Sequence, residues 1–285
     1  MSRAMIKPLI ISSVVSLQHE LESALKLRGH SCTTIYPAHF DHCESAAGES
    51  TIVVDIDSVY SAQASELQRF TDAQFERVIA FCRAHDLPLL MLSHGGVFGS
   101  GSTQRYRESD IPETNSTDNN PHKILCARES SLRAQLSRYI ILRTGPLIAA
   151  RGENMLTRLL QRIRAGGRVN VASAPRFCPT PQSDVARVIC GIIEQLDCGA
   201  EPWGAYHYQS ADATNCYEFA EAVLAAGQYW NLEQTQLHNE PGAVCPDVLP
   251  LLHCQCIRDT FGIQQLSWRR AIPGLLKQIF EGEKA

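Results

Sequence analysis

Short runs of apolar residues alternate along the chain with segments in which apolar residues recur every three or four positions. The runs are typical of buried β-strands, and the recurring pattern is typical of amphipathic helices. The predicted strands are Pro8–Val15, Ser31–Tyr36, Ser50–Asp57, Leu87–Ser93, Tyr139–Thr144 and Gly204–Gln209. The predicted helices are His19–Arg28, Thr71–His85, Lys123–Ser137, Asn154–Ala165, Ser183–Leu196, Tyr217–Ala226 and Ser267–Phe280. This alternation predicts an α/β fold with a parallel sheet that helices cover on both faces.

A polar segment between Gly95 and Pro121 interrupts the alternation. It is rich in Gly, Ser, Asn and Asp, which favour turns over regular structure. Loops of this length usually act as lids over a site or are disordered. We therefore predict a long loop that follows the strand ending near Ser93.

The composition is that of a globular protein, with 44% hydrophobic and 20% charged residues and a formal net charge of -4. This charge argues against nucleic-acid binding through a broad basic surface, and it leaves room for a nucleotide-sized ligand. No apolar run approaches the roughly 18 residues that a membrane span needs. The apolar stretch Pro8–Leu17 is followed by Gln18, His19 and Glu20 instead of a small-residue cleavage site. We expect a cytoplasmic protein that contacts neither nucleic acid nor membrane.

The 11 cysteines are an odd number and are scattered from Cys32 to Cys256. In a cytosolic protein we expect them to be reduced and mostly buried. The densest group of potential metal ligands is His238, Cys245, His253, Cys254 and Cys256. Its two neighbouring cysteines are one residue apart, which is not the paired spacing of a zinc site. We therefore predict core packing and no metal.

Several short motifs occur in the same order as in one known family, between about Leu90 and Gly227. They are Leu92-Ser93 with Val97-Phe98, Tyr106-x-Glu108-x-Asp110-x-Pro112, Ala127-x-Glu129, Leu142-Arg143-Thr144, Pro179-Thr180 with Asp184-Val185-Ala186, and Gly204-Ala205-Tyr206-His207 with Tyr217-Glu218-Phe219-Ala220. In this order the chain resembles the dTDP-4-dehydrorhamnose reductases, which are extended or atypical short-chain dehydrogenases. The resemblance implies a Rossmann-like doubly wound sheet over residues 1–145, with contributions from later segments. It also implies a smaller substrate-binding part over residues 146–285.

The glycine-rich turn of that family is missing. Its glycines let the backbone approach the cofactor pyrophosphate at a helix N-terminus. The matching stretch, Ser12–Gln18, contains no glycine. We predict that Val14, Val15 or a neighbouring side chain partly plugs the groove. Ser12, Ser13 and Ser16 are then the only candidates for holding a cofactor, which would be NADP or NAD.

The catalytic pair that the resemblance implies is also missing. In the family a Tyr donates a proton to the substrate, and a Lys four residues later lowers the pKa of that Tyr. Alignment on Ala127-x-Glu129 places Pro121 and Leu125 at these two positions, and neither side chain can titrate. His94 occupies the position of an assisting Thr. No Tyr-x-x-x-Lys occurs between residues 94 and 144.

The remaining candidates for chemistry are three residues near the strand end and the predicted loop, namely Ser93, His94 and Tyr106. The candidates for substrate binding are Arg143, Arg176, Thr180 and Tyr217. Each has a structural alternative, because no nucleophile, base and orienting group stand together in the sequence.

Two classes of function follow. The first is a degenerate reductase-like protein with a non-catalytic binding or regulatory role, which would contact a nucleotide sugar, a protein partner or a second copy of itself. The second is an NAD(P)-dependent reductase or epimerase of 4-keto nucleotide sugars that uses displaced catalytic residues. A third hypothesis is a sensor that binds a nucleotide sugar alone.

Overall fold

The computed structural model describes residues 6–42, 50–60, 70–99, 105–113, 122–166, 168–243 and 248–282. At its centre is a six-stranded sheet in which every pairing is parallel, in the order β10-β6-β4-β3-β1-β2. Its strands are β1 (Pro8–Ile11), β2 (Thr33–Ile35), β3 (Ile52–Asp55), β4 (Leu89–His94), β6 (Tyr139–Thr144) and β10 (Gly204–Tyr208). From β1 the chain adds β2 on one side and then β3, β4, β6 and β10 in turn on the other, as in doubly wound folds.

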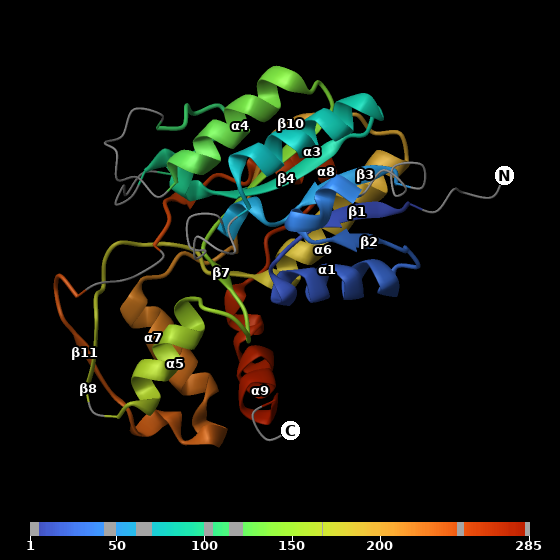
Figure 1. Cartoon of the computed structure of the whole chain (residues 1–285). Coiled ribbons are helices and arrows are strands. Elements are labelled where there is room, and N and C mark those ends of the chain that lie inside the picture. Colours follow the sequence, from blue (N-terminus) through green and yellow to red (C-terminus); the bar gives the residue numbers. More distant parts are fainter. Residues whose placement is uncertain are drawn as a thin grey trace.

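Helices cover both faces of the sheet (Figure 1). On one face lie α3 (Asp72–Ala84) and α4 (Lys123–Gln135), which contact each other. On the other face α1 (Val15–Leu27) packs against α6 (Gln182–Asp197). The central strands are buried on both faces, which is why they appear in the sequence as continuous apolar runs. The predicted α/β fold is confirmed.

A second group of elements forms a smaller part with its own hydrophobic cluster. It contains α5 (Met155–Arg164), α7 (Cys216–Ala226) and α9 (Ile272–Gly282), together with a parallel pair of strands, β8 (Arg168–Val171) and β11 (Gln236–Asn239). Figure 1 shows it beside the carboxyl ends of the main sheet. Between α5 and α7 the chain returns to the main sheet, because α6 and β10 belong to the first cluster.

The remaining strands and one further helix are short. They are β5 (Arg105–Tyr106), β7 (Leu147–Ile148), β9 (Thr180–Pro181), β12 (Leu251–Leu252) and α8 (Gln255–Phe261). β5 pairs with β12, and β7 pairs with β9. The sequence pattern predicted none of these elements, because a two-residue strand has no periodicity and α8 has only 7 residues. Most of their pairing partners are far away along the chain.

The predicted element bounds agree best where an apolar run fills the whole strand. β6 has the predicted bounds, Tyr139–Thr144. The first strand was predicted to extend to Val15, but it ends at Ile11 and α1 begins at Val15. The side chain of Val15 is exposed on the first turn of that helix. The predicted strand was too long because Val15, an apolar residue of the helix, continues the apolar run of the strand.

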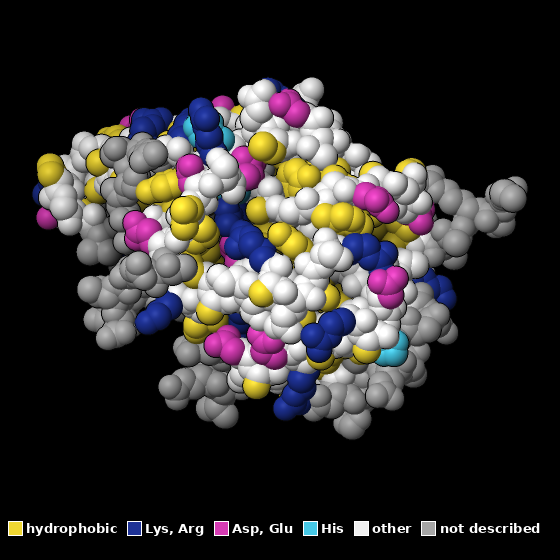
Figure 2. Space-filling model, turned by 90° about the horizontal axis from the view of Figure 1, so that it is seen from above, with side chains coloured by type: hydrophobic (Ala, Val, Ile, Leu, Met, Phe, Trp, Pro, Cys, Tyr) yellow, Lys and Arg dark blue, Asp and Glu magenta, His cyan; other side chains and the backbone are white. Residues whose placement is uncertain are grey.

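The structure also places the charged side chains, the cysteines and the potential metal ligands. On the face in Figure 2, Lys and Arg side chains are interspersed with Asp and Glu side chains. Eight described cysteines are free, whereas Cys216 is disulfide-bonded, which corrects the expectation of a reduced thiol there. The described residues include no group of three or more His, Cys, Asp or Glu side chains placed to hold a metal. No helix within the described ranges is long and apolar enough to cross a membrane.

Candidate functional site

A cavity of about 380 Å³ lies at the carboxyl ends of the central strands. Ligand sites of open α/β sheets collect at this edge. Its lining comes from segments far apart in the sequence and includes Val14 and Ser16 at α1, Tyr60 after β3, His94 at the end of β4, His122 before α4 and Gln182 at the start of α6. The smaller part contributes the loop after β7, including Arg151, Glu153 and Asn154. Of the predicted site residues, His94 and Ser16 are the two that line this cavity.

Two histidine rings stand together in the cavity wall. The ring centroids of His94 and His122 are 4.6 Å apart, and the rings are perpendicular. The Nδ1 of His94 accepts a hydrogen bond of 3.0 Å from the backbone N–H of Gly96, so a neutral His94 carries its proton on Nε2. Burial lowers the pKa of His94 to about 3 and also lowers the pKa of His122. Both rings are therefore neutral at pH 7.

The sequence did not point to His122. It precedes α4, next to Pro121, which lies outside the described residues. The available signal was that a titratable residue adjoins the position of the family's catalytic Tyr. Gly96 makes room for the two rings, because a Cβ at that position would lie 2.7 Å from atoms of each. Leu125, at the position of the family's Lys, is fully buried in the core.

The segment just before α1 already bonds to a carboxylate of the protein. Both the backbone N–H and the Oγ of Ser13 donate to Oδ1 of Asp57, each at 2.5 Å. The backbone N–H of Val14 donates to Oγ of Ser12 at 3.0 Å. The first N–H groups of a helix form the site where this fold holds phosphate. Here side chains of the protein use two of the N–H groups that precede the helix.

Asp57 is buried, with 3% of its surface exposed, as is Asp55 in the same segment. Burial raises the pKa of Asp57, and the hydrogen bonds from Ser13 oppose this shift. A carboxylate here repels a phosphate as well as occupying its donors. The residues at the start of α1 therefore do not fit the diphosphate of a nicotinamide dinucleotide in its usual position. Val14 and Val15 were predicted to plug the groove at the start of α1. Val14 lines the cavity and Val15 is exposed. The group that opposes a dinucleotide here is the carboxylate of Asp57.

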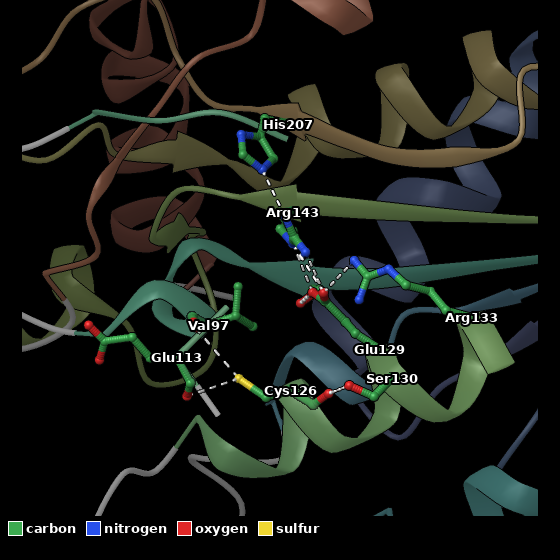
Figure 3. Close-up of polar contacts among 9 residues, drawn as sticks. Val97, Glu113, Cys126, Glu129, Ser130, Arg133, Arg143 and His207 are labelled. Carbon is green, nitrogen blue, oxygen red and sulfur yellow. Dashed lines mark hydrogen bonds and ion pairs between the residues drawn. The ribbon is translucent and has the colours of Figure 1, made fainter. Parts of the chain in front are cut away.

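Ser93 and Arg143 belong to a buried polar cluster around Glu129, and Figure 3 shows Arg143 between Glu129 and His207. Arg143 donates to Glu129 of α4 from Nε at 3.0 Å and from Nη2 at 2.6 Å. The Oγ of Ser93 donates to the same carboxylate at 2.8 Å, and Nη1 of Arg143 lies 3.2 Å from Nε2 of His207. Ser93, Glu129 and Arg143 are fully buried. Neither predicted residue reaches the cavity, because strand register directs both side chains into this cluster.

Tyr106 and Thr180 also have protein partners away from the cavity. The ring of Tyr106 stacks on Phe98 with centroids 4.5 Å apart, and β5 places it beside β12. Thr180 is buried in β9, and its Oγ1 donates to the carbonyl oxygen of Cys178 at 3.1 Å. Neither residue lines the cavity.

Arg176 and Tyr217 lie in the smaller part. Nη1 of Arg176 is 3.4 Å from the carboxylate of Glu218, and both side chains are largely exposed. Tyr217 packs against the second hydrophobic cluster. The structure thus separates these two residues from the cavity lining, and their predicted roles in substrate binding stay predictions.

The comparisons with known proteins agree with this architecture. A family model described as the RmlD substrate binding domain matches residues 54–280. The chain belongs to the dTDP-4-dehydrorhamnose reductase family. It is a divergent member, because it is 24% identical over 236 residues to the dTDP-4-dehydrorhamnose reductase of Aggregatibacter actinomycetemcomitans, a match that covers 78% of this chain and 74% of that protein.

Solved structures of the family and its relatives share the fold. The dTDP-4-dehydrorhamnose reductase of Bacillus anthracis in complex with NADP has a TM-score of 0.75 and 16% identity, over 96% of this chain and 98% of that chain. The enzyme WbmH of Bordetella bronchiseptica in complex with NAD+ has a TM-score of 0.78 and 16% identity, over 99% and 100%. These likenesses show that the chain shares the Rossmann-like fold of these proteins.

The buried cluster in Figure 3 generates a stability prediction. In Glu129→Gln, the guanidinium of Arg143 stays buried without its counter-charge, so we expect the free energy of unfolding to fall by about 3 kcal/mol or more. Urea unfolding followed by circular dichroism measures the loss. Glu221→Gln, the same change at an exposed position of α7, is the control and should change stability by less than about 0.5 kcal/mol. Equal stability of the two variants would show that the cluster is not stabilising.

Asp55 generates a pH prediction. Burial raises its pKa to about 6, although hydrogen bonds from Ser58 oppose the shift. The folded protein therefore holds this proton more tightly than the unfolded chain does. The contribution of Asp55 to the free energy of unfolding should be largest near pH 4, fall as the pH rises to about 6, and stay constant above that.

Asp55→Asn keeps an acceptor oxygen and removes the charge. The stability of this variant relative to the natural protein should rise between pH 4 and pH 6, by up to about 3 kcal/mol. Thermal unfolding of both proteins across this range measures the difference, and carboxylates that do not interact with Asp55 cancel in the comparison. A difference that does not change with pH would contradict the prediction.

Proposed function

We propose that this chain is a nucleotide-sugar-binding protein on a reductase scaffold, without nicotinamide-dependent reduction. The observation that carries the proposal is the carboxylate of Asp57 on the N–H and Oγ of Ser13. Ser13 lies just before α1, whose N-terminus favours an anion through its N–H groups and its dipole. With a carboxylate already there, a cofactor diphosphate would have to displace a hydrogen-bonded group of the same charge.

The chemistry of the cavity supports the same conclusion. A reductase of this family needs an acid that gives up its proton near neutral pH. Burial raises the pKa of Tyr60, and His94 and His122 are neutral at pH 7. Leu125 stands where a Lys would lower the pKa of a nearby Tyr. None of these cavity groups is tuned for proton donation.

The second candidate is an NAD(P)-dependent reductase or epimerase of 4-keto nucleotide sugars with displaced catalytic residues. One observation favours it, which is that the His94 and His122 rings line the cavity together. Two structural relatives are described with NADP or NAD+ bound. In this alternative one of the two imidazoles replaces the missing Tyr as the proton donor.

The same proposal includes a cellular location and a binding partner for the protein. We place the protein in the cytoplasm, which the eight free thiols among the described cysteines favour. A non-catalytic member would act through a protein partner or a second copy of itself, and the nucleotide sugar would be the signal that it reports. The family, which shares its fold with nucleotide-sugar enzymes such as UDP-glucose 4-epimerase, supports this class of ligand.

Two titrations test the function. Calorimetry with dTDP-glucose should give heat of binding, and NADPH and NADH should give none and no change in nicotinamide fluorescence, because Asp57 opposes their diphosphate. NADPH should not be oxidised when a dTDP-4-keto sugar is added. The absorbance of NADPH in its long-wavelength band measures whether NADPH is oxidised.

Tight NADPH binding together with oxidation that depends on the keto sugar would overturn the proposal in favour of the second candidate. In that case His94→Asn and His122→Asn identify the acid by loss of kcat. His85→Asn, at an exposed position beyond α3, is the matched control and should keep full activity. Absence of heat with every nucleotide sugar tested would reject both candidates as stated.

A further inference from the structure

The wall of the cavity contains a buried amide whose hydrogen bonds are incomplete. Gln182 begins α6 and is 5% exposed. Its Nε2 donates to the hydroxyl of Tyr60 at 2.7 Å, whereas its Oε1 has no hydrogen-bond partner among the described residues. An unsatisfied buried acceptor costs about 1 to 3 kcal/mol. Such a group in a cavity wall marks a place where a ligand can supply the missing bond.

The orientation of the amide does not change this conclusion. A tyrosine hydroxyl can accept from an amide nitrogen or donate to an amide oxygen, so the Gln182 amide could be turned either way. In both orientations Tyr60 satisfies one atom of the amide and the other remains unsatisfied. A ligand hydroxyl, which both donates and accepts, completes the set in either case. A phosphate can only accept, and an ammonium can only donate.

The other polar groups of the wall divide by charge. His94 is 5% exposed, is neutral, and keeps a donor on Nε2 because its Nδ1 already accepts from Gly96. The charged lining groups Arg151 and Glu153 are exposed, and Glu153 is paired with Arg158. The buried part of the cavity is therefore uncharged: it combines apolar side chains such as Val59 and Leu249 with these hydrogen-bonding groups, and the charged groups stand at the rim.

We propose that Gln182 and Tyr60 form a hydroxyl-recognition pair in the cavity wall that binds the uncharged sugar ring of the ligand. A ring hydroxyl completes the hydrogen bonds of the Gln182 amide, and the Nε2–H of His94 donates to a second oxygen. The nucleotide end of the ligand lies toward the exposed rim, where Arg151 stands. This assignment rests on the proposed function for its nucleotide and names the part of the ligand that gives specificity.

The test compares three probes on the full chain. These are dTDP-glucose and dTDP by calorimetry, and D-glucose by saturation-transfer NMR. We expect dTDP-glucose to bind at least about tenfold more tightly than dTDP, since a buried hydrogen-bonding group discriminates strongly against a ligand that lacks its partner. We expect Gln182→Leu to remove this difference and leave the dTDP affinity unchanged.

Two further variants keep the outcome decisive. Gln255→Leu makes the same change at the first residue of α8, at an exposed position, and should bind all probes as the natural protein does. Tyr60→Phe removes a single oxygen atom, so it stays informative where the leucine variant does not fold. It should weaken dTDP-glucose severalfold and leave dTDP unchanged.

The outcomes separate the two proposals. If D-glucose binds and neither nucleotide does, the nucleotide-sugar function fails and the hydroxyl-recognition pair stands. If dTDP binds as tightly as dTDP-glucose, or if the Gln182 and Tyr60 variants bind dTDP-glucose unchanged, the pair is overturned and nucleotide binding stands. If neither sugar-bearing probe binds, both are overturned.

Discussion

The arrangement of the site depends on the buried ion pair between Arg143 and Glu129. Arg143 lies near the end of β6, Glu129 lies on α4, and Ser93 of β4 and His207 of β10 bond to the same pair. Three strand ends and one helix are thus held at a single point. Because two buried charges are stable only when they face each other, this point tolerates little displacement. His94 follows Ser93 directly, and α4 begins next to His122, so the cavity inherits its geometry from this cluster.

A second buried carboxylate, that of Asp57, lies beside the segment that leads into α1. Asp57 occupies donors at the start of α1, where the fold holds a phosphate. The sheet order and the covering helices are retained, because they depend on apolar burial and not on the cofactor. The fold by itself therefore does not decide whether a cofactor binds. The same cavity then offers a different set of contacts, in which uncharged groups form the buried part and charged groups form the rim.

The main strands and helices could be predicted because each is encoded locally. A parallel strand buried on both faces requires a continuous apolar run, and an amphipathic helix requires its period, as in β6 and α3. The short strands β5, β7, β9 and β12 could not be predicted, because two residues carry no pattern. The site was predicted only in part: His94 was named from its place at a strand end, whereas Arg143, proposed as a ligand contact, lies in the buried cluster with Glu129.

The sequence by itself determined the fold class, the family, and the loss of the glycine turn and of the Tyr and Lys pair. These features are written in the order and type of residues along the chain. Only the tertiary structure decided what replaced them. Asp57 meets Ser13 across 44 positions, and Gln182 meets Tyr60 across 122. No local pattern encodes such contacts, because they arise when the carboxyl ends of parallel strands meet at one edge of the sheet.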